Sequence, residues 1–181
     1  MDTYIALLRG INVSGKNPVP MAKLKETFAG LGFADVKTYL QSGNVVFRTK
    51  KKTAPAKLAS EIEAAISHDF GHQVSVLVLT PGEIEHVAAH NPLWPKSGGE
   101  LTHFHATFLF DPVSKATFDA LKLPAAEGER ALLSKGVVLL HCPHGYGNTK
   151  LNNTWFEKAL KVRATTRNWR TVQALREMAA D

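Results

Sequence analysis

The order of apolar segments in the first half of the chain strongly limits the folds it can adopt. Short runs rich in β-branched residues predict strands, and apolar residues spaced three or four positions apart predict helices. We therefore expect a strand at 4–8, a helix at 21–31, two hairpin strands at 36–40 and 44–48, a helix from 55 and a strand at 74–79. This order, strand–helix–strand–strand–helix–strand, is that of the ferredoxin-like fold.

The second half of the chain repeats this order with shorter elements. Thr80 and Glu83 form the pattern of a capping box, which predicts a connecting helix that continues to His90. After it we expect a strand at 103–110, a helix at 114–121, a hairpin at 130–140, a helix capped by Asn152 or Asn153, a reduced last strand near Val162 and a helix capped by Thr165 or Thr166. The sequence thus predicts an α+β protein with two ferredoxin-like (βαββαβ-type) subdomains, residues 1–80 and 81–181, each with an antiparallel sheet.

A long polar loop, residues 9–20, follows the first strand and is the first candidate site. The expected strand order, 4-1-3-2, places the end of the first strand beside the start of the third, so this loop should meet residues 41–44. Glycine backbone and amide or cationic side chains suit an anion. The residues that we expect to surround it are Arg9, Asn12, Lys16, Asn17, Gln41, Ser42 and Asn44. The alternative is a structural loop whose polar groups satisfy one another.

The same geometry predicts a second polar cluster in the second half. Residues 141–150 should lie near His103 and His105, and residues 167–170 should approach the same edge. Helix N-termini there would favour an anion. The candidate ligand-binding residues are Tyr146, Asn148, Lys150, Arg167, Asn168, Trp169 and Arg170.

The histidines near the only cysteine raise the question of a metal. His103 and His105 share a predicted strand face, and His141, Cys142 and His144 could lie opposite. Imidazole and thiolate are zinc ligands, yet the chain has no HExxH or paired CxxC motif, and eight histidines form close pairs by chance. We expect hydrogen-bonded or surface histidines, no metal, no cofactor and an unreactive Cys142.

Charge and hydrophobicity narrow the classes of partner. The 22 Lys and Arg exceed the 16 Asp and Glu, for a net charge of +6, which mildly favours nucleic acid or a phosphorylated small molecule. No apolar run approaches the roughly 20 residues of a membrane span. Arg9 interrupts the apolar N-terminus, so no signal peptide is expected, and the single cysteine points to the cytoplasm. The oligomeric state does not follow from the sequence.

Three stretches together resemble a known family. They are residues 4–17, with Ala-Leu-Leu-Arg-Gly-Ile-Asn-Val; residues 38–47, with Gln-Ser-Gly-Asn-Val-Val-Phe; and residues 164–172, with Thr-Thr-Arg-Asn-Trp-Arg-Thr-Val. On these motifs the chain is identified as a member of an uncharacterised bacterial family, domain-of-unknown-function family 1697. The resemblance implies a fold of two ferredoxin-like subdomains and implies no activity.

Three functional hypotheses follow. The first is a cytosolic protein that binds an anionic ligand through the polar loops. The second is an enzyme that uses the cleft of Arg9, Gln41 and Asn44, although the nearest carboxylate in sequence is Asp35 and no acid–base pair is visible. The third is a structural or protein-interaction module with Trp94 and its flanking prolines as a surface patch. RNA recognition of the usual sheet type is disfavoured, because the two central strands offer only Tyr4 and Phe47 for stacking.

Overall fold

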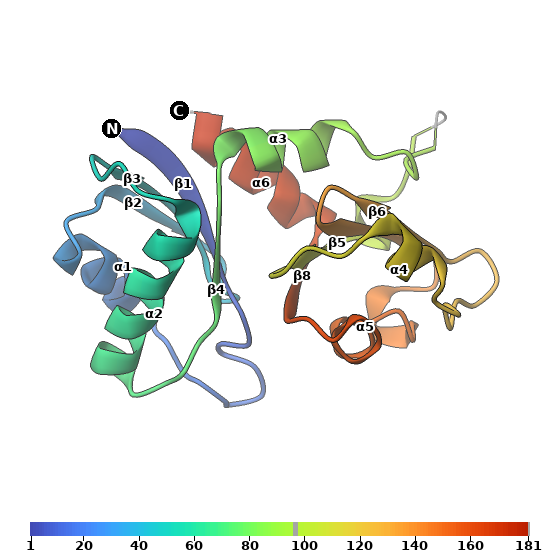
Figure 1. The fold of residues 1–181 in the computed structure, drawn as a ribbon, viewed down its shortest axis with the longest axis horizontal. Helices are drawn as coiled ribbons and strands as arrows, with labels where there is room; N and C mark the ends of the chain where they lie inside the picture. Colours follow the sequence, from blue (N-terminus) through green and yellow to red (C-terminus); the bar gives the residue numbers. More distant parts are fainter. Residues whose placement is uncertain (96–97, 181) are drawn as a thin grey trace. The chain divides into compact units, whose positions relative to one another are not determined.

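The computed structural model describes residues 1–95 and 98–180, which form two compact units (Figure 1). The first unit contains Met1–Glu85 and the residues from Ala174 on, and the second contains His86–Gln173. Each unit holds a four-stranded antiparallel sheet with flanking helices, so the predicted α+β class with two ferredoxin-like subdomains is confirmed.

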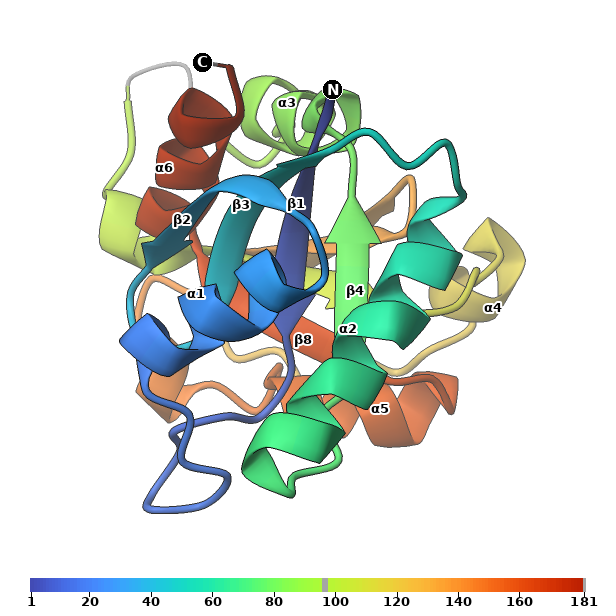
Figure 2. The same cartoon turned by 90° about the vertical axis from the view of Figure 1, so that its left-hand side faces the viewer.

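The first unit has the predicted topology. Its elements are β1 (Asp2–Leu8), α1 (Met21–Gly30), β2 (Ala34–Tyr39), β3 (Asn44–Thr49), α2 (Pro55–Phe70), β4 (Val76–Leu79) and the start of α3 (Pro81–Ala89). The strands lie in the order β2-β3-β1-β4, and α1 and α2 cover one face of the sheet (Figure 2). The capping box at α3 is present: the backbone N–H of Thr80 donates to Glu83 at 2.8 Å, and that of Glu83 donates to Thr80 at 3.2 Å.

The core of the first unit lies between this sheet face and its two helices. Phe28 on α1 and Ile62 on α2 are fully buried at helical spacing within their apolar stripes. Phe47 of β3 meets them, with its ring centroid 5.4 Å from that of Phe28 and 4.5 Å from that of Phe33. Because side chains alternate across a strand, the pairing of Tyr4 with Phe47 places both on the helix side of the sheet.

The second unit repeats the arrangement. Its elements are η1 (Leu101–His103), β5 (Phe104–Leu109), α4 (Lys115–Asp119), β6 (Arg130–Ser134), β7 (Val137–His141), η2 (Tyr146–Asn148), α5 (Asn153–Leu160), β8 (Ala164–Asn168) and the start of α6 (Trp169–Ala180). The strand order is β6-β7-β5-β8. A core of Leu109, Val138, Leu140, Phe156 and Leu160, among others, fills the helix-covered face.

The end of the second sheet differs in detail from the prediction. The short last strand begins at Ala164 instead of near Val162, and it includes Thr165 and Thr166, which were expected to cap the next helix. Asn168 pairs with His105 in the sheet and is itself the cap, because its Oδ1 atom accepts from the backbone N–H of Thr171 at 2.9 Å. Pairing with β5 thus extends the strand past both threonines. Among the described residues, no helix is long and apolar enough to span a bilayer.

Candidate ligand-binding site

The two polar loops of the first unit converge at one edge of the sheet, as the strand order requires. The backbone N–H of Leu8 donates to the carbonyl oxygen of Gly43 at 2.9 Å, and Leu7 pairs with Asn44. Gly43 has a φ of +85°, and a Cβ atom there would lie 2.8 Å from Cδ1 of Ile11. The glycine is therefore required for the close approach of the loops.

Asn12 holds the two loops together. Its Oδ1 atom accepts from the backbone N–H of Val19 at 2.7 Å, and its Nδ2 atom donates to the carbonyl oxygens of Val19 at 2.9 Å and Gln41 at 2.8 Å. Its φ of 53° is a left-handed conformation that asparagine tolerates better than most residues. Both hydrogens of this amide are therefore used within the protein.

The other predicted asparagines make internal bonds as well. Asn17 donates to the carbonyl oxygen of Gly10 at 3.0 Å. Asn44 is buried and donates to the carbonyl oxygen of Tyr39 at 2.8 Å and to Oγ of Ser42 at 2.9 Å. These contacts agree with the interpretation that the loops satisfy one another's polar groups.

The charged members of this cluster lie at its surface. Lys16 is exposed and lies in a tight turn, in which its backbone N–H donates to the carbonyl oxygen of Val13 at 2.8 Å. Arg9 is half-buried. Gln41 is exposed. Asp35, the nearest carboxylate in sequence, forms an ion pair with Arg48 at 3.2 Å.

The second predicted cluster is divided between the two faces of its sheet. Arg167 pairs with Ala106, and Asn168 pairs with His105, so these neighbours point to opposite faces. Tyr146 lies on the face of His105, with the two ring centroids 4.5 Å apart. Its hydroxyl accepts from the backbone N–H of Asn153 at 2.9 Å, and burial raises its pKa.

The cations of the second cluster differ in accessibility. Arg167 is buried and donates to Oγ1 of Thr165 at 2.6 Å and to the carbonyl oxygen of Thr166 at 3.1 Å, and burial lowers its pKa to about 10. Lys150 and Arg170 are exposed. The structure therefore does not gather all the predicted residues around one ligand position.

The histidines around Cys142 lie in separate environments. Burial lowers the pKa of His105 to about 4, so its imidazole is neutral at pH 7. His141 stacks on Phe104 with centroids 4.6 Å apart, and His144 bonds to the carbonyl oxygen of Glu127 at 2.8 Å. Within residues 1–95 and 98–180, no three His, Cys, Asp or Glu side chains are grouped as metal ligands would be.

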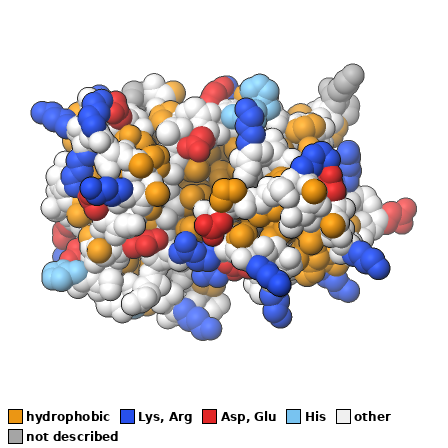
Figure 3. All heavy atoms as spheres, viewed as in Figure 1, with side chains coloured by type: hydrophobic (Ala, Val, Ile, Leu, Met, Phe, Trp, Pro, Cys, Tyr) orange, Lys and Arg blue, Asp and Glu red, His pale blue; other side chains and the backbone are white. Residues whose placement is uncertain are grey.

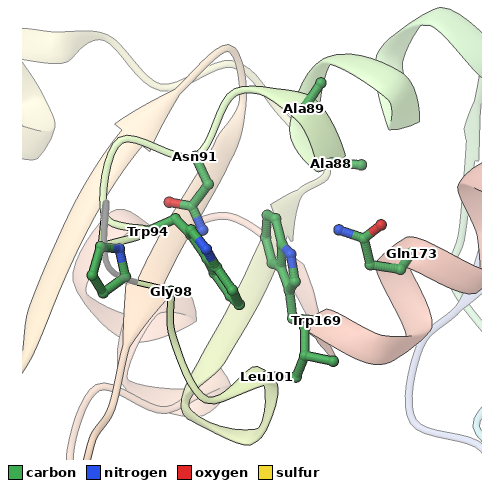
Figure 4. A pocket seen from close by; sticks show the side chains of 9 residues that line it. Ala88, Ala89, Asn91, Trp94, Gly98, Leu101, Trp169 and Gln173 are labelled. Atoms are coloured by element: carbon green, nitrogen blue, oxygen red, sulfur yellow. The ribbon is translucent and has the colours of Figure 1, made fainter.

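The second unit contains a cavity that was not predicted from the sequence. Its volume is about 500 Å³, and its walls include Trp94, Trp169, Asn91, Leu101 and Gln173 together with small side chains at the end of α3 (Figure 4). Trp169 was predicted as a ligand residue, whereas Trp94 was assigned to no predicted ligand site. The two tryptophans lie far apart in the sequence, and the only local signal was the break Asn-Pro-Leu-Trp-Pro at 91–95.

A tight turn and a helix start position the two indoles. The backbone N–H of Trp94 donates to the carbonyl oxygen of Asn91 at 3.1 Å. The backbone N–H of Leu93 donates to the Oδ1 atom of Asn91 at 3.0 Å. Trp169 is the first residue of α6, and Gln173 follows one turn later on the same helix face. We call the space between Trp94 and Trp169 the tryptophan cleft.

Phe104 supports one wall of the tryptophan cleft. Its ring centroid is 4.5 Å from that of Trp94. A Cβ atom on Gly99 would lie 2.9 Å from Cε2 of Phe104 and 3.1 Å from Cδ of Pro95. A larger residue at position 99 would therefore displace the aromatic wall.

Comparison with known proteins places the chain in a family. Residues 1–139 match the model of the family described as "Protein of unknown function (DUF1697)". The chain belongs to the DUF1697 family. The resemblance found in the sequence motifs is thereby confirmed. Among curated proteins, the comparison gave no match for this DUF1697 protein.

A solved structure supports the fold of this DUF1697 protein. The conserved bacterial protein SP0830 from Streptococcus pneumoniae is similar, with a TM-score of 0.76, 24% identity and 98% of each chain covered. At that level of identity the likeness shows the fold alone.

Proposed function

We propose that this DUF1697 protein binds a nucleotide, free or as one unit of a single-stranded nucleic acid, with the base in the tryptophan cleft. The observation that carries the proposal is the presence of two indoles, Trp94 and Trp169, on the walls of one cavity of about 500 Å³. Small-molecule sites commonly measure about 300–1,000 Å³. Stacking of a base on an aromatic side chain contributes about 1–3 kcal/mol.

The surroundings of the cleft suit the phosphate of such a ligand. Arg170 is exposed and lies three residues before Gln173, a wall residue, so the two occupy neighbouring positions on α6. The N-terminus of this helix also begins beside the cleft, where its dipole favours negative charge. Arg170 is therefore the group that we assign to the phosphate.

The distribution of charge favours a local binding site over a broad basic surface that would bind nucleic acid along its length. On the face in Figure 3 the Lys and Arg side chains are dispersed, and acidic side chains lie among them. Lys51 pairs with Glu61 at 2.5 Å, and Lys52 pairs with Asp2 at 3.0 Å. Pairing of this kind reduces the field that a net charge of +6 would otherwise produce.

The loop pair of the first unit is our second proposed anion site. Arg9 and Lys16 lie on a backbone that Asn12 holds in a fixed conformation, which favours preorganised binding. Both proposals place the protein in the cytoplasm, where nucleotides and nucleic acids are abundant. Lys16 is exposed and belongs only to the loop pair, so a substitution there tests this site without changing the tryptophan cleft.

Titration of the protein with the four nucleoside monophosphates and with labelled single-stranded oligonucleotides tests the proposal. Trp94→Ala should weaken binding by about fivefold or more, since one stacking contact contributes about 1–3 kcal/mol. Arg170→Ala should also weaken binding, because it removes the cation that we assign to the phosphate. Trp155→Phe and Lys158→Ala, at residues of α5 outside the cleft walls, are the controls and should bind normally. Lys16→Ala reports on the loop pair.

The outcomes separate the sources of the ligand. Binding of oligonucleotides but not of monophosphates identifies a nucleic-acid partner, and the reverse identifies a free nucleotide. No binding at low salt, or binding that Trp94→Ala leaves intact, contradicts the proposed site. A loss confined to Lys16→Ala would move the function to the loop pair.

A further inference from the structure

The side-chain amide of Asn91 has a fixed orientation in the tryptophan cleft. The backbone N–H of Leu93 donates to its Oδ1 atom at 3.0 Å, in a turn that asparagine side chains commonly make. The backbone N–H of Leu93 can bond only to the amide oxygen of Asn91. Exchanging the positions of Oδ1 and Nδ2 would therefore break this bond. The Nδ2 atom is therefore the group directed away from the turn.

That Nδ2 atom is an unused donor. It is buried and, within the described parts of the chain, has no hydrogen-bond partner. In the view of Figure 4 the amide nitrogen points to the side of the Trp94 indole, and both residues line the cleft. Buried polar groups in native proteins nearly always have a partner, so this donor has a hydrogen bond to offer to a ligand in the cleft.

The position of Trp94 explains how the donor is both buried and available. Asn91 and Trp94 both line the cavity, and the turn that joins them holds only the backbone of Trp94. A rotation of the Trp94 side chain would therefore leave both hydrogen bonds of the turn intact. Phe104 packs against the same indole and would follow the change.

We propose that Asn91 is the hydrogen-bond donor of the cleft that binds the edge of the base, and that it is uncovered when Trp94 shifts on ligand entry. Its Nδ2 atom donates to an acceptor on the edge of the base, either a carbonyl oxygen or an unprotonated ring nitrogen. Planar rings without such an acceptor are rejected, because they would leave the donor unpaired. This inference rests on the proposed nucleotide site and assigns the group that reads the base.

Two substitutions separate the donor from the turn. Asn91→Ser removes the amide nitrogen and retains an oxygen that can accept from Leu93, without added charge. Asn91→Asp retains the acceptor geometry and replaces the donor with a second acceptor. Asn152→Ser is the matched control, because the Oδ1 atom of Asn152 likewise accepts from a backbone N–H, that of Trp155 at 2.9 Å, and the residue lies outside the cleft walls.

The experiment uses the full chain labelled with 5-fluorotryptophan, with the Trp94 resonance assigned by its loss in Trp94→Phe. AMP, GMP, CMP and UMP are titrated into the native protein and the three asparagine variants. We expect the Trp94 resonance to shift on binding, with affinity at least tenfold weaker in Asn91→Ser and Asn91→Asp but unchanged in Asn152→Ser. Unaltered resonances in the free variants establish that they fold.

The failures are distinguishable. If none of the four monophosphates or their single-stranded homopolymers binds, both the site and the role of Asn91 are overturned. If binding depends on Trp94 but is equal in native protein, Asn91→Ser and Asn91→Asp, only the role of Asn91 is overturned. If both variants lose binding while the Trp94 resonance is unmoved in the native complex, the proposed uncovering is wrong.

Discussion

The imidazole of His105 stacks on the phenol ring of Tyr146, with centroids 4.5 Å apart, in the interior of the second unit. Burial lowers the pKa of His105 from 6.5 to about 4. The unfolded chain therefore binds a proton at a higher pH than the folded chain does. The stability that depends on a neutral His105 is complete above pH 6.5 and is lost as the pH falls toward 4.

Replacement of His105 by phenylalanine tests this linkage. The variant keeps a ring for Tyr146 and cannot titrate, so its melting temperature should fall less between pH 6.5 and 4 than that of the native protein. His144→Phe, at an exposed position, should keep the native pH profile. Parallel profiles for native protein and His105→Phe would show that His105 is not the group responsible.

Gly43→Ala should destabilise the first unit. The added Cβ would lie 2.7 Å from Cβ of Leu8, in a backbone conformation with φ of +85°. Strain and overpacking of this kind cost about 1–3 kcal/mol. Urea unfolding measures the loss, and Gly30→Ala, which meets open space at the end of α1, should change stability by less than about 1 kcal/mol. Equal effects from both substitutions would contradict the close-packing explanation.

Gly99→Ala should impair the tryptophan cleft more than it impairs folding. Phe104 must move away from a Cβ atom that would lie 2.9 Å from its ring, and Trp94 packs on Phe104. We expect nucleotide affinity to fall about threefold to tenfold, equal to about 0.6–1.4 kcal/mol. Gly147→Ala is the control, because a Cβ atom added at Gly147 would have no atom within 4 Å. Native affinity in Gly99→Ala would show that the wall adapts without cost.

Cys142 should be unreactive in the folded protein. It is fully buried, and burial raises its pKa to about 11, so almost no thiolate exists at pH 8. A chromogenic disulfide reagent should modify the thiol only at the rate of unfolding, and urea should accelerate the reaction. Rapid modification without denaturant would mean that the β7 end opens readily.

The fold could be predicted because its signals are local. Apolar spacing set the helices on which Phe28 and Ile62 lie, and the order of elements set which strands are neighbours. The sites could not be predicted to the same extent, because they depend on single-residue registers. One step along β8 moves a side chain from the face of Arg167 to that of Asn168.

The hydrogen-bond partners of the asparagine side chains could not be predicted from the sequence either. Asn12, Asn17 and Asn44 carry the donors that a ligand loop needs, but each donor finds a backbone carbonyl nearby. Asn91 has the same chemistry and lacks a described partner for Nδ2. No pattern in the sequence distinguishes these amides, since the difference arises from tertiary packing.

The membership of α6 in both units has a consequence for the order of synthesis. Residues from Ala174 on belong with Met1–Glu85, and Arg176 donates to Glu85 through Nη2 at 2.8 Å. During translation the first 85 residues therefore emerge without the helical segment that completes the first unit. That segment is made only after the whole second unit has been translated. The first unit must therefore wait for a segment that is separated from Glu85 by the 88 residues of the second unit, His86–Gln173.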